Sequence, residues 1–175
     1  CLQSQSLTVT GGSTPPFTTD NLISNVFLGE GVEVTSVVFK GKASAVGYFT
    51  GGGPNIGIPR GIVLTTGRAN GADGVGNTQE STPNASTATD PDLNAIATAG
   101  LNDVAVYIIK FIPTADTLRF RYCFASEEYP EFACQVFNDV FGFFIQGPGF
   151  PTPTNIARVP STTQAVSINN IHPAN

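Results

Sequence analysis

The sequence is poor in the residue types on which most catalytic sites depend. Among its 175 residues it has no Trp, no Met and a single His. A Ser-His-Asp or Cys-His site would need that residue, His172, and nothing around His172 resembles such a site. The Cys and His spacing of common zinc sites is absent as well. These absences argue against most enzyme classes, and no residue is predicted to be catalytic.

Positive charge is also scarce. The only lysines are Lys40, Lys42 and Lys110, charged residues make up 12% of the chain, and the formal net charge is −5. This composition disfavours nucleic acid and anionic membrane surfaces as partners, because binding to both needs concentrated Lys and Arg. The longest strongly apolar run, residues 140–145, is interrupted by Gly142 and is too short to span a bilayer. A charge-poor chain rich in Thr, Ser, Asn and Gly is typical of a secreted or cell-surface β-protein.

What the sequence does contain is a series of β-rich segments. Alternating or apolar runs predict strands over residues 7–10, 32–39, 43–49, 61–66, 104–112, 117–125, 140–146, 157–159 and 165–168. The alternation changes phase near Ser36, which predicts a bulge. Residues 104–112 and 117–125 are expected to pair as a hairpin around 113–116, and the apolar run 140–146 to be a central strand. The predicted fold class is mainly β, an antiparallel β-sandwich of jelly-roll type with two short helices.

The two helices are marked by their caps. Thr18 or Thr19 caps the first, and Asp90-Pro91 begins the second, which is expected to end at Gly100. Their predicted apolar faces consist of Leu22, Ile23, Val26 and Phe27 in the first, and of Leu93, Ile96 and Ala97 in the second. The length indicates one domain over residues 17–175, continuing beyond the last residue if the chain is a fragment, after an extended lead-in at 1–16. Residues 67–89 form a long irregular stretch, which in a compact domain is usually functional or mobile.

The most informative segment runs from Cys123 to Gly149. It sets acidic side chains between aromatic strands, where charge is costly unless water, hydrogen bonds or a cation offsets it. Oxygen ligands of the kind that calcium prefers are supplied by Glu127, Glu128, Glu131, Asn138 and Asp139. The alternative is a purely structural corner, in which these carboxylates bond to backbone N–H groups, to Tyr129 and to nearby arginines.

Three cysteines leave an odd count. Cys1 is either the lipidated residue of a processed bacterial lipoprotein or a remnant of a signal peptide or of the boundary chosen for the chain. Cys123 and Cys134 flank the acidic segment, and a disulfide between them would staple it. Pairing with a cysteine beyond the last residue, or two buried thiols, are the alternatives.

Several motifs together resemble the choice-of-anchor L domain of bacterial secreted proteins. The most specific are Ser-Glu-Glu-Tyr-Pro-Glu-Phe at 126–132 and Phe-Asn-Asp-Val-Phe at 137–141. The remaining matched segments are 21–32, 61–67, 118–125, 142–149, 155–160 and 166–170. The similarity covers nearly everything after residue 17.

The resemblance implies an exported bacterial protein that is tethered to the cell surface or released outside. Members of the family carry varied C-terminal anchors, including type IX secretion signals, and often belong to large adhesin-like proteins. The family is not defined by a reaction, so no catalytic residue is carried over. We therefore expect a non-enzymatic module for adhesion or surface assembly, whose partners are other surface proteins or copies of itself. The alternatives are a glycan-binding, lectin-like module assisted by calcium and, more weakly, a hydrolase that uses two carboxylates.

Overall fold

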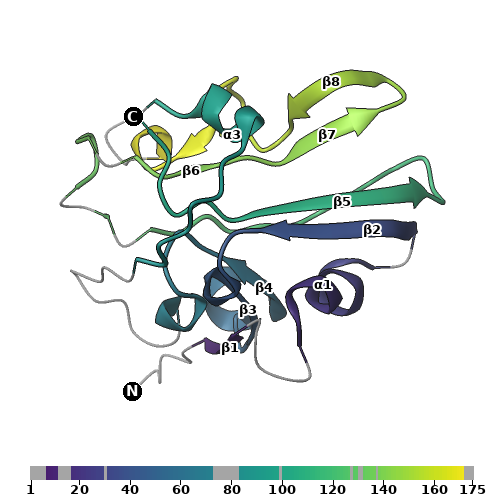
Figure 1. Cartoon of the computed structure of the whole chain (residues 1–175), viewed down its shortest axis with the longest axis horizontal. Coiled ribbons are helices and arrows are strands. Elements are labelled where there is room, and N and C mark those ends of the chain that lie inside the picture. Colours follow the sequence, from purple (N-terminus) through teal and green to yellow (C-terminus); the bar gives the residue numbers. More distant parts are fainter. Residues whose placement is uncertain are drawn as a thin grey trace. The chain divides into compact units, whose positions relative to one another are not determined.

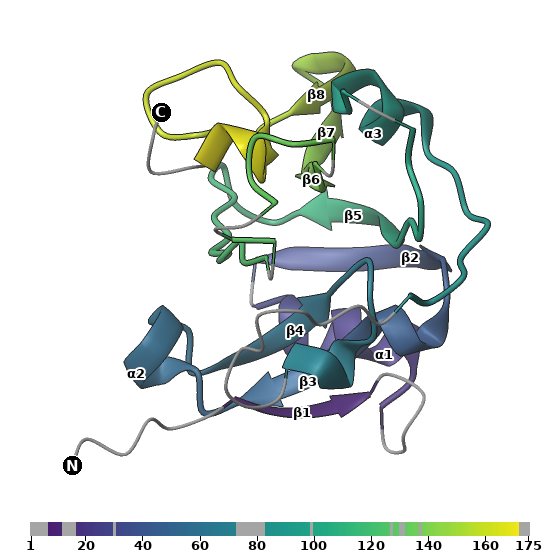
Figure 2. The same ribbon diagram turned by 90° about the vertical axis from the view of Figure 1, so that its left-hand side faces the viewer.

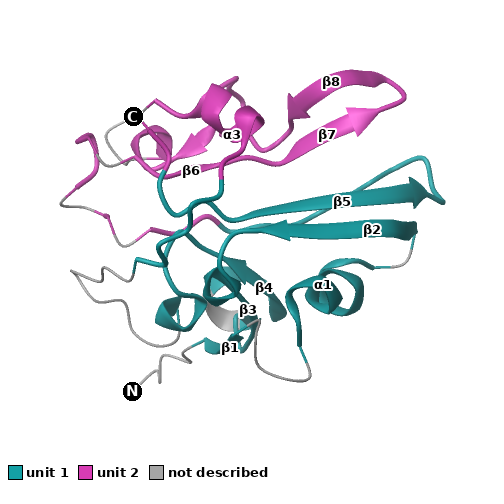
Figure 3. Ribbon diagram, in the orientation of Figure 1, with its two compact units in different colours: residues 1–88, 102–123 teal, residues 89–101, 124–175 magenta. Residues whose placement is uncertain are grey.

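The computed structural model describes residues 7–11, 17–29, 31–72, 83–98, 100–126, 128–129, 132–136 and 138–171. The chain divides into two compact units: unit 1 holds residues 1–88 and 102–123, and unit 2 holds residues 89–101 and 124–175 (Figure 3). Among the described residues, the strands form one three-stranded sheet and three two-stranded sheets, and every pairing is antiparallel. The mainly β, antiparallel class is confirmed. The jelly-roll sandwich and the single domain over residues 17–175 stay predictions.

The three-stranded sheet of unit 1 has the order β1-β3-β4, from β1 (Thr8–Gly11), β3 (Val46–Thr50) and β4 (Arg60–Leu64) (Figure 1). Its core joins Val9 and Phe49 to Ala69 of a 3₁₀ turn, η3 (Ala69–Ala72). Another 3₁₀ turn, η2 (Ala43–Ala45), replaces the beginning of the strand predicted from residue 43. The loop predicted at 51–59 contains a short helix, α2 (Gly53–Ile56).

The second sheet of unit 1 pairs β2 (Val32–Lys40) with β5 (Val106–Pro113). Val34 lies opposite Phe111 and Ser36 opposite Lys110, so Thr35 is the extra residue of a bulge. This confirms the predicted phase change.

The predicted hairpin of residues 104–112 with 117–125 is wrong. The partner of β5 is β2, and residues 117–125 belong to no strand. Alternation along 117–125 indicated which side chains share a face, but it could not identify a partner strand.

A short helix lies beside β2 in unit 1 (Figures 1 and 2). It begins as α1 (Thr19–Leu22) and continues as a π-helical turn, η1 (Ile23–Phe27). Thr18 caps it as predicted: the Asn21 N–H donates to the Thr18 hydroxyl, and Asn21 Oδ1 accepts from the Thr18 N–H at 2.6 Å. The Tyr107 hydroxyl on β5 donates to the Thr19 carbonyl at 2.7 Å and so anchors the helix to the β2–β5 sheet.

Unit 2 begins with α3 (Pro91–Ile96), whose predicted cap is confirmed. The Asp90 carboxylate accepts from the N–H groups of Asp92 and Leu93. The predicted end at Gly100 is wrong, because Ala97 is already extended and closes the helix.

The remaining strands of unit 2 form two pairs. β6 (Val140–Phe141) pairs with β9 (Val166–Ser167), and β7 (Phe144–Gly147) pairs with β8 (Phe150–Asn155). The predicted central strand at 140–146 is therefore two short strands with different partners. The break falls at Gly142, where the Phe144 ring occupies the space that a Cβ atom would take. A last 3₁₀ turn, η4 (Asn169–Ile171), follows β9.

Candidate functional site

The first candidate site is the acidic corner, which we define as Glu128, Tyr129, Asn138, Asp139 and Asn169 of unit 2. Of the predicted calcium ligands, Glu128, Asn138 and Asp139 are described, whereas Glu127 and Glu131 lie outside the described residues. The described part of the chain contains no group of three or more Asp, Glu, His or Cys side chains arranged to hold a metal. The calcium site stays a prediction.

The two described carboxylates of the acidic corner act on each other. Burial and, to a smaller extent, the negative charge of Asp139 raise the pKa of Glu128. A bound cation or protonation of Glu128 would relieve this repulsion.

The amide and phenol groups of the acidic corner serve as structural links. Asn138 Oδ1 accepts from the Asn169 N–H at 3.0 Å, and its Nδ2 donates to the Thr98 hydroxyl at 2.8 Å. The Tyr129 hydroxyl donates to the Ile168 carbonyl at 2.9 Å, and burial raises its pKa. Tyr129 thus bonds to the backbone after β9, and the predicted structural alternative for the carboxylates stays a prediction.

Cys123 of unit 1 and Cys134 of unit 2 are both exposed, and the disulfide between them stays a prediction. Cys134 lies in a turn with a φ of 65°, not on a strand, and its N–H donates to Asn169 Oδ1 at 2.7 Å. Asn169 therefore helps to hold the turn that contains Cys134. Cys1, the predicted lipidation site, lies outside the described residues.

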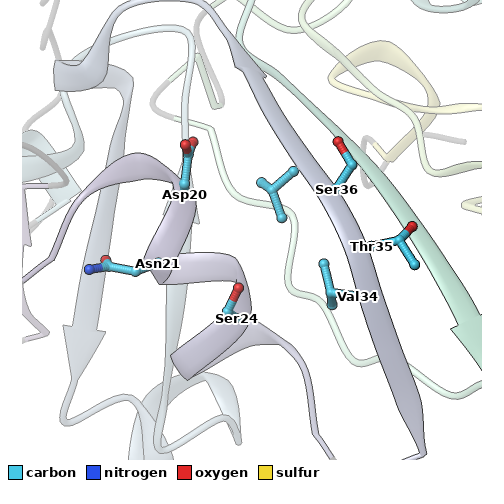
Figure 4. Close-up of a pocket in the computed structure, with 7 residues that line it drawn as sticks. Asp20, Asn21, Ser24, Val34, Thr35 and Ser36 are labelled. Atoms are coloured by element: carbon cyan, nitrogen blue, oxygen red, sulfur yellow. The ribbon is translucent and has the colours of Figure 1, made fainter.

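A second candidate site is a shallow groove of about 330 Å³ in unit 1, which we call the Asp20 groove (Figure 4). Asp20, Asn21 and Ser24 line it from the helix, and residues 34–37 line it from β2. Figure 4 shows Asp20, Ser24 and Val34 bordering the groove, whereas Asn21 and Thr35 point away from it. Sequence analysis found its two parts, the capped helix and the bulge, without placing them together.

The third candidate is an aromatic pair that follows β5. The rings of Phe120 and Tyr122 stack with centroids 5.7 Å apart and an interplanar angle of 23°. Tyr122 is 40% exposed and Leu118 is 42% exposed. The Arg121 guanidinium donates to the Gly57 carbonyl at 2.6 Å, which ties this segment to the end of α2. The result is an accessible aromatic surface of the kind that sugar rings or apolar side chains contact.

Comparison with protein families identifies the chain. A model of the Choice-of-anchor L domain matches residues 10–175. The chain belongs to the choice-of-anchor L family. Comparison with curated proteins and with solved structures finds no match.

Membership confirms the resemblance drawn from the motifs. Choice-of-anchor domains are a non-catalytic type of surface module, and this one is a module of a bacterial surface or secreted protein. Within the described residues, no helix has the length and apolar character needed to cross a bilayer.

The segments that carried the resemblance fall on all three candidate sites of this choice-of-anchor L domain. Residues 21–32 include most of the helix beside the Asp20 groove, residues 118–125 carry the aromatic pair, and residues 126–132 with 137–141 carry the acidic corner. The motifs therefore do not single out one site. The choice between the sites has to come from their chemistry.

Proposed function

We propose that this choice-of-anchor L domain is a non-enzymatic extracellular module that serves adhesion or surface assembly. The observation that carries the proposal is an apolar face on the β2–β5 sheet. Val38, Ile108 and Ile112 are 46%, 36% and 53% exposed. Contiguous exposed apolar side chains with a polar surround are typical of protein interaction surfaces.

The pairing of the two strands explains why these side chains lie together. Val38 lies opposite Ile108 in the neighbouring strand. Alternate residues of a strand share a face, so Ile108, Lys110 and Ile112 lie on the same face of β5. Val38, Ile108 and Ile112 therefore share one face of the sheet. Lys40 and Lys110, two of the few cations of the chain, are exposed at the same alternate positions. The face therefore combines three exposed apolar side chains with two lysines, one of them between the isoleucines, and with Glu33 opposite Ile112. It suits other surface proteins or copies of this acidic chain better than it suits a cationic partner.

The test compares a double substitution on this face with the substitution of an exposed valine in unit 2. Beads coated with the chain should aggregate in a self-adhesion assay, and the chain should self-associate in sedimentation at high concentration. Val38→Ser combined with Ile108→Ser should abolish both effects. Val136→Ser removes a valine that is 79% exposed in unit 2 and should leave both unchanged. Dispersed beads and a monomer at every concentration would exclude assembly, and turnover of a polysaccharide would overturn the non-enzymatic assignment.

A glycan-binding, lectin-like module is the second candidate. The stacked and exposed aromatic pair supports it, and the repulsion between Glu128 and Asp139 supports calcium assistance. The stretch 67–89 is the other predicted lining of such a site, and its residues 73–82 lie outside the described residues.

A glycan array separates this candidate from assembly. Loss of binding in Tyr122→Ala, with retention in Tyr122→Phe, would favour an aromatic platform. Loss in Glu128→Ala or Asp139→Ala, or on addition of a chelator, would favour calcium. A melting temperature that is the same with calcium and with chelator would remove the metal.

A further inference from the structure

The Asp20 groove has one polar wall, from the helix, and one apolar wall, from β2. The helix contributes the Asp20 carboxylate and the Ser24 hydroxyl, and β2 contributes Val34 and Val37. Residues three apart on a regular strand would point to opposite faces. Val34 and Val37 line the same groove because Thr35 is the extra residue of the bulge.

The carboxylate is held in position by its neighbours. Asp20 lies in the first turn of α1, between the residues of the capping box, and the Tyr107 bond to Thr19 fixes that turn to β5. Its Oδ1 accepts from the Thr19 hydroxyl at 3.2 Å. Among the described residues, no Lys or Arg forms an ion pair with Asp20. The groove thus presents an exposed carboxylate, which forms no ion pair with a described Lys or Arg, beside a small apolar wall.

These features limit the chemical classes of ligand that the groove can bind. The Asp20 carboxylate with the Ser24 and Ser36 hydroxyls offers too few oxygens for a divalent cation, which takes six or more. Anions are repelled by Asp20. A compact cation on an apolar stem matches both walls at once, and the lysine side chain is the common protein group of this form. The groove is shallow and open, with a volume of about 330 Å³, which suits one side chain better than a larger ligand.

We propose that the Asp20 groove binds an alkylammonium group, the lysine side chain of a protein partner, with the ammonium on Asp20 and Ser24 and the stem on Val34 and Val37. The groove is distinct from the apolar β2–β5 face, so this proposal does not depend on the proposed function. A partner could use either surface alone.

The probe is n-butylamine, titrated into the full chain at neutral pH and low salt while the valine methyl signals are followed by NMR. The Val34 and Val37 methyls should shift saturably. 1-Butanol, which lacks the charge, and methylamine, which lacks the stem, should each bind more weakly. Equal affinity for methylamine and butylamine would reduce the site to a simple ion pair and overturn the proposal.

Asp20→Asn should weaken butylamine about fivefold, the upper end for an exposed ion pair. Asp116→Asn is the matched control, because Asp116 also accepts a 3.2 Å bond from the adjacent threonine hydroxyl but does not line the groove. Val34→Ala should weaken butylamine while leaving methylamine unchanged. Absence of any saturable shift at Val34 and Val37, or equal binding by Asp20→Asn and Asp116→Asn, would exclude the site whether or not the beads aggregate.

Discussion

The Cys134 N–H donates a 2.7 Å hydrogen bond to Oδ1 of Asn169, which joins the turn before β6 to the 3₁₀ turn after β9. Asn169→Ala would leave that N–H without this partner and should cost about 0.5–1.5 kcal/mol in the free energy of unfolding. Asn169→Asp keeps the acceptor and should recover most of the loss. Chemical denaturation measures the difference, with the exposed Asn102→Ala as control. If Asn169→Ala were as stable as Asn102→Ala, the link would have no role in holding the turn.

Gly142 is a position where a methyl group has no room. An added Cβ would meet the Phe144 ring and Ile96, so Gly142→Ala should destabilise unit 2 by about 1–3 kcal/mol, as overpacking does. The control is Gly100→Ala in the same unit, where a Cβ would have nothing within 4 Å. Gly100→Ala should be neutral or slightly stabilising in the same denaturation experiment. Equal stability of the two variants would contradict the packing described for Phe144.

The stability of the acidic corner should depend on pH through Glu128. Its pKa is raised by burial and by Asp139, so the carboxyl contributes full stability below its unfolded pKa and loses it as the pH rises through the folded one. Glu128→Gln should therefore raise the melting temperature at neutral pH, and its advantage should vanish as the pH falls below about 4.3. Glu33→Gln on β2 is the control. A Glu128→Gln advantage that is constant from acid to neutral pH would contradict the electrostatic cause.

Tyr107 should stabilise unit 1 through its hydroxyl. Tyr107→Phe removes the donor to Thr19 and should cost about 1 kcal/mol. Tyr48→Phe is a matched control, because Tyr48 also packs on an aromatic ring, Phe17, at 4.9 Å. Thermal melts of both variants measure the difference. A Tyr48→Phe variant less stable than Tyr107→Phe would count against the anchoring bond.

Local signals in the sequence predicted local structure well. The Thr18 and Asp90 caps and the phase change near Ser36 each depend on a few neighbouring residues, and the structure has all of them. The end of α3 and the interruption at Gly142 were missed. The first is set by the extended backbone of Ala97, and the second by a ring that packs over the glycine.

Pairing and sites were harder to predict, because they depend on contacts between distant residues. Nothing along residues 117–125 indicates that β2 would be the partner of β5. Asn169 could have been suspected from the Asn-Asn pair after a strand, but its contact with Cys134 spans 35 positions. The Asp20 groove forms because the predicted helix and the predicted bulge lie side by side, and no pattern in the sequence indicates that they do.

The bulge at Thr35 changes which side chains of β2 face inward, the even-numbered or the odd-numbered ones. Before it the even-numbered side chains, such as Val34, lie opposite inward residues of β5, and after it the odd-numbered ones, such as Val37 and Phe39, do so. Thr35 has no opposite residue on β5, so deleting it would leave Val34 and Ser36 adjacent, opposite Phe111 and Lys110, and would keep every side chain on its face. Deleting a residue after the bulge would instead exchange the faces of the side chains beyond it, because side chains alternate along a strand. β2 should therefore accept the loss of Thr35, yet tolerate no loss among the paired residues that follow it.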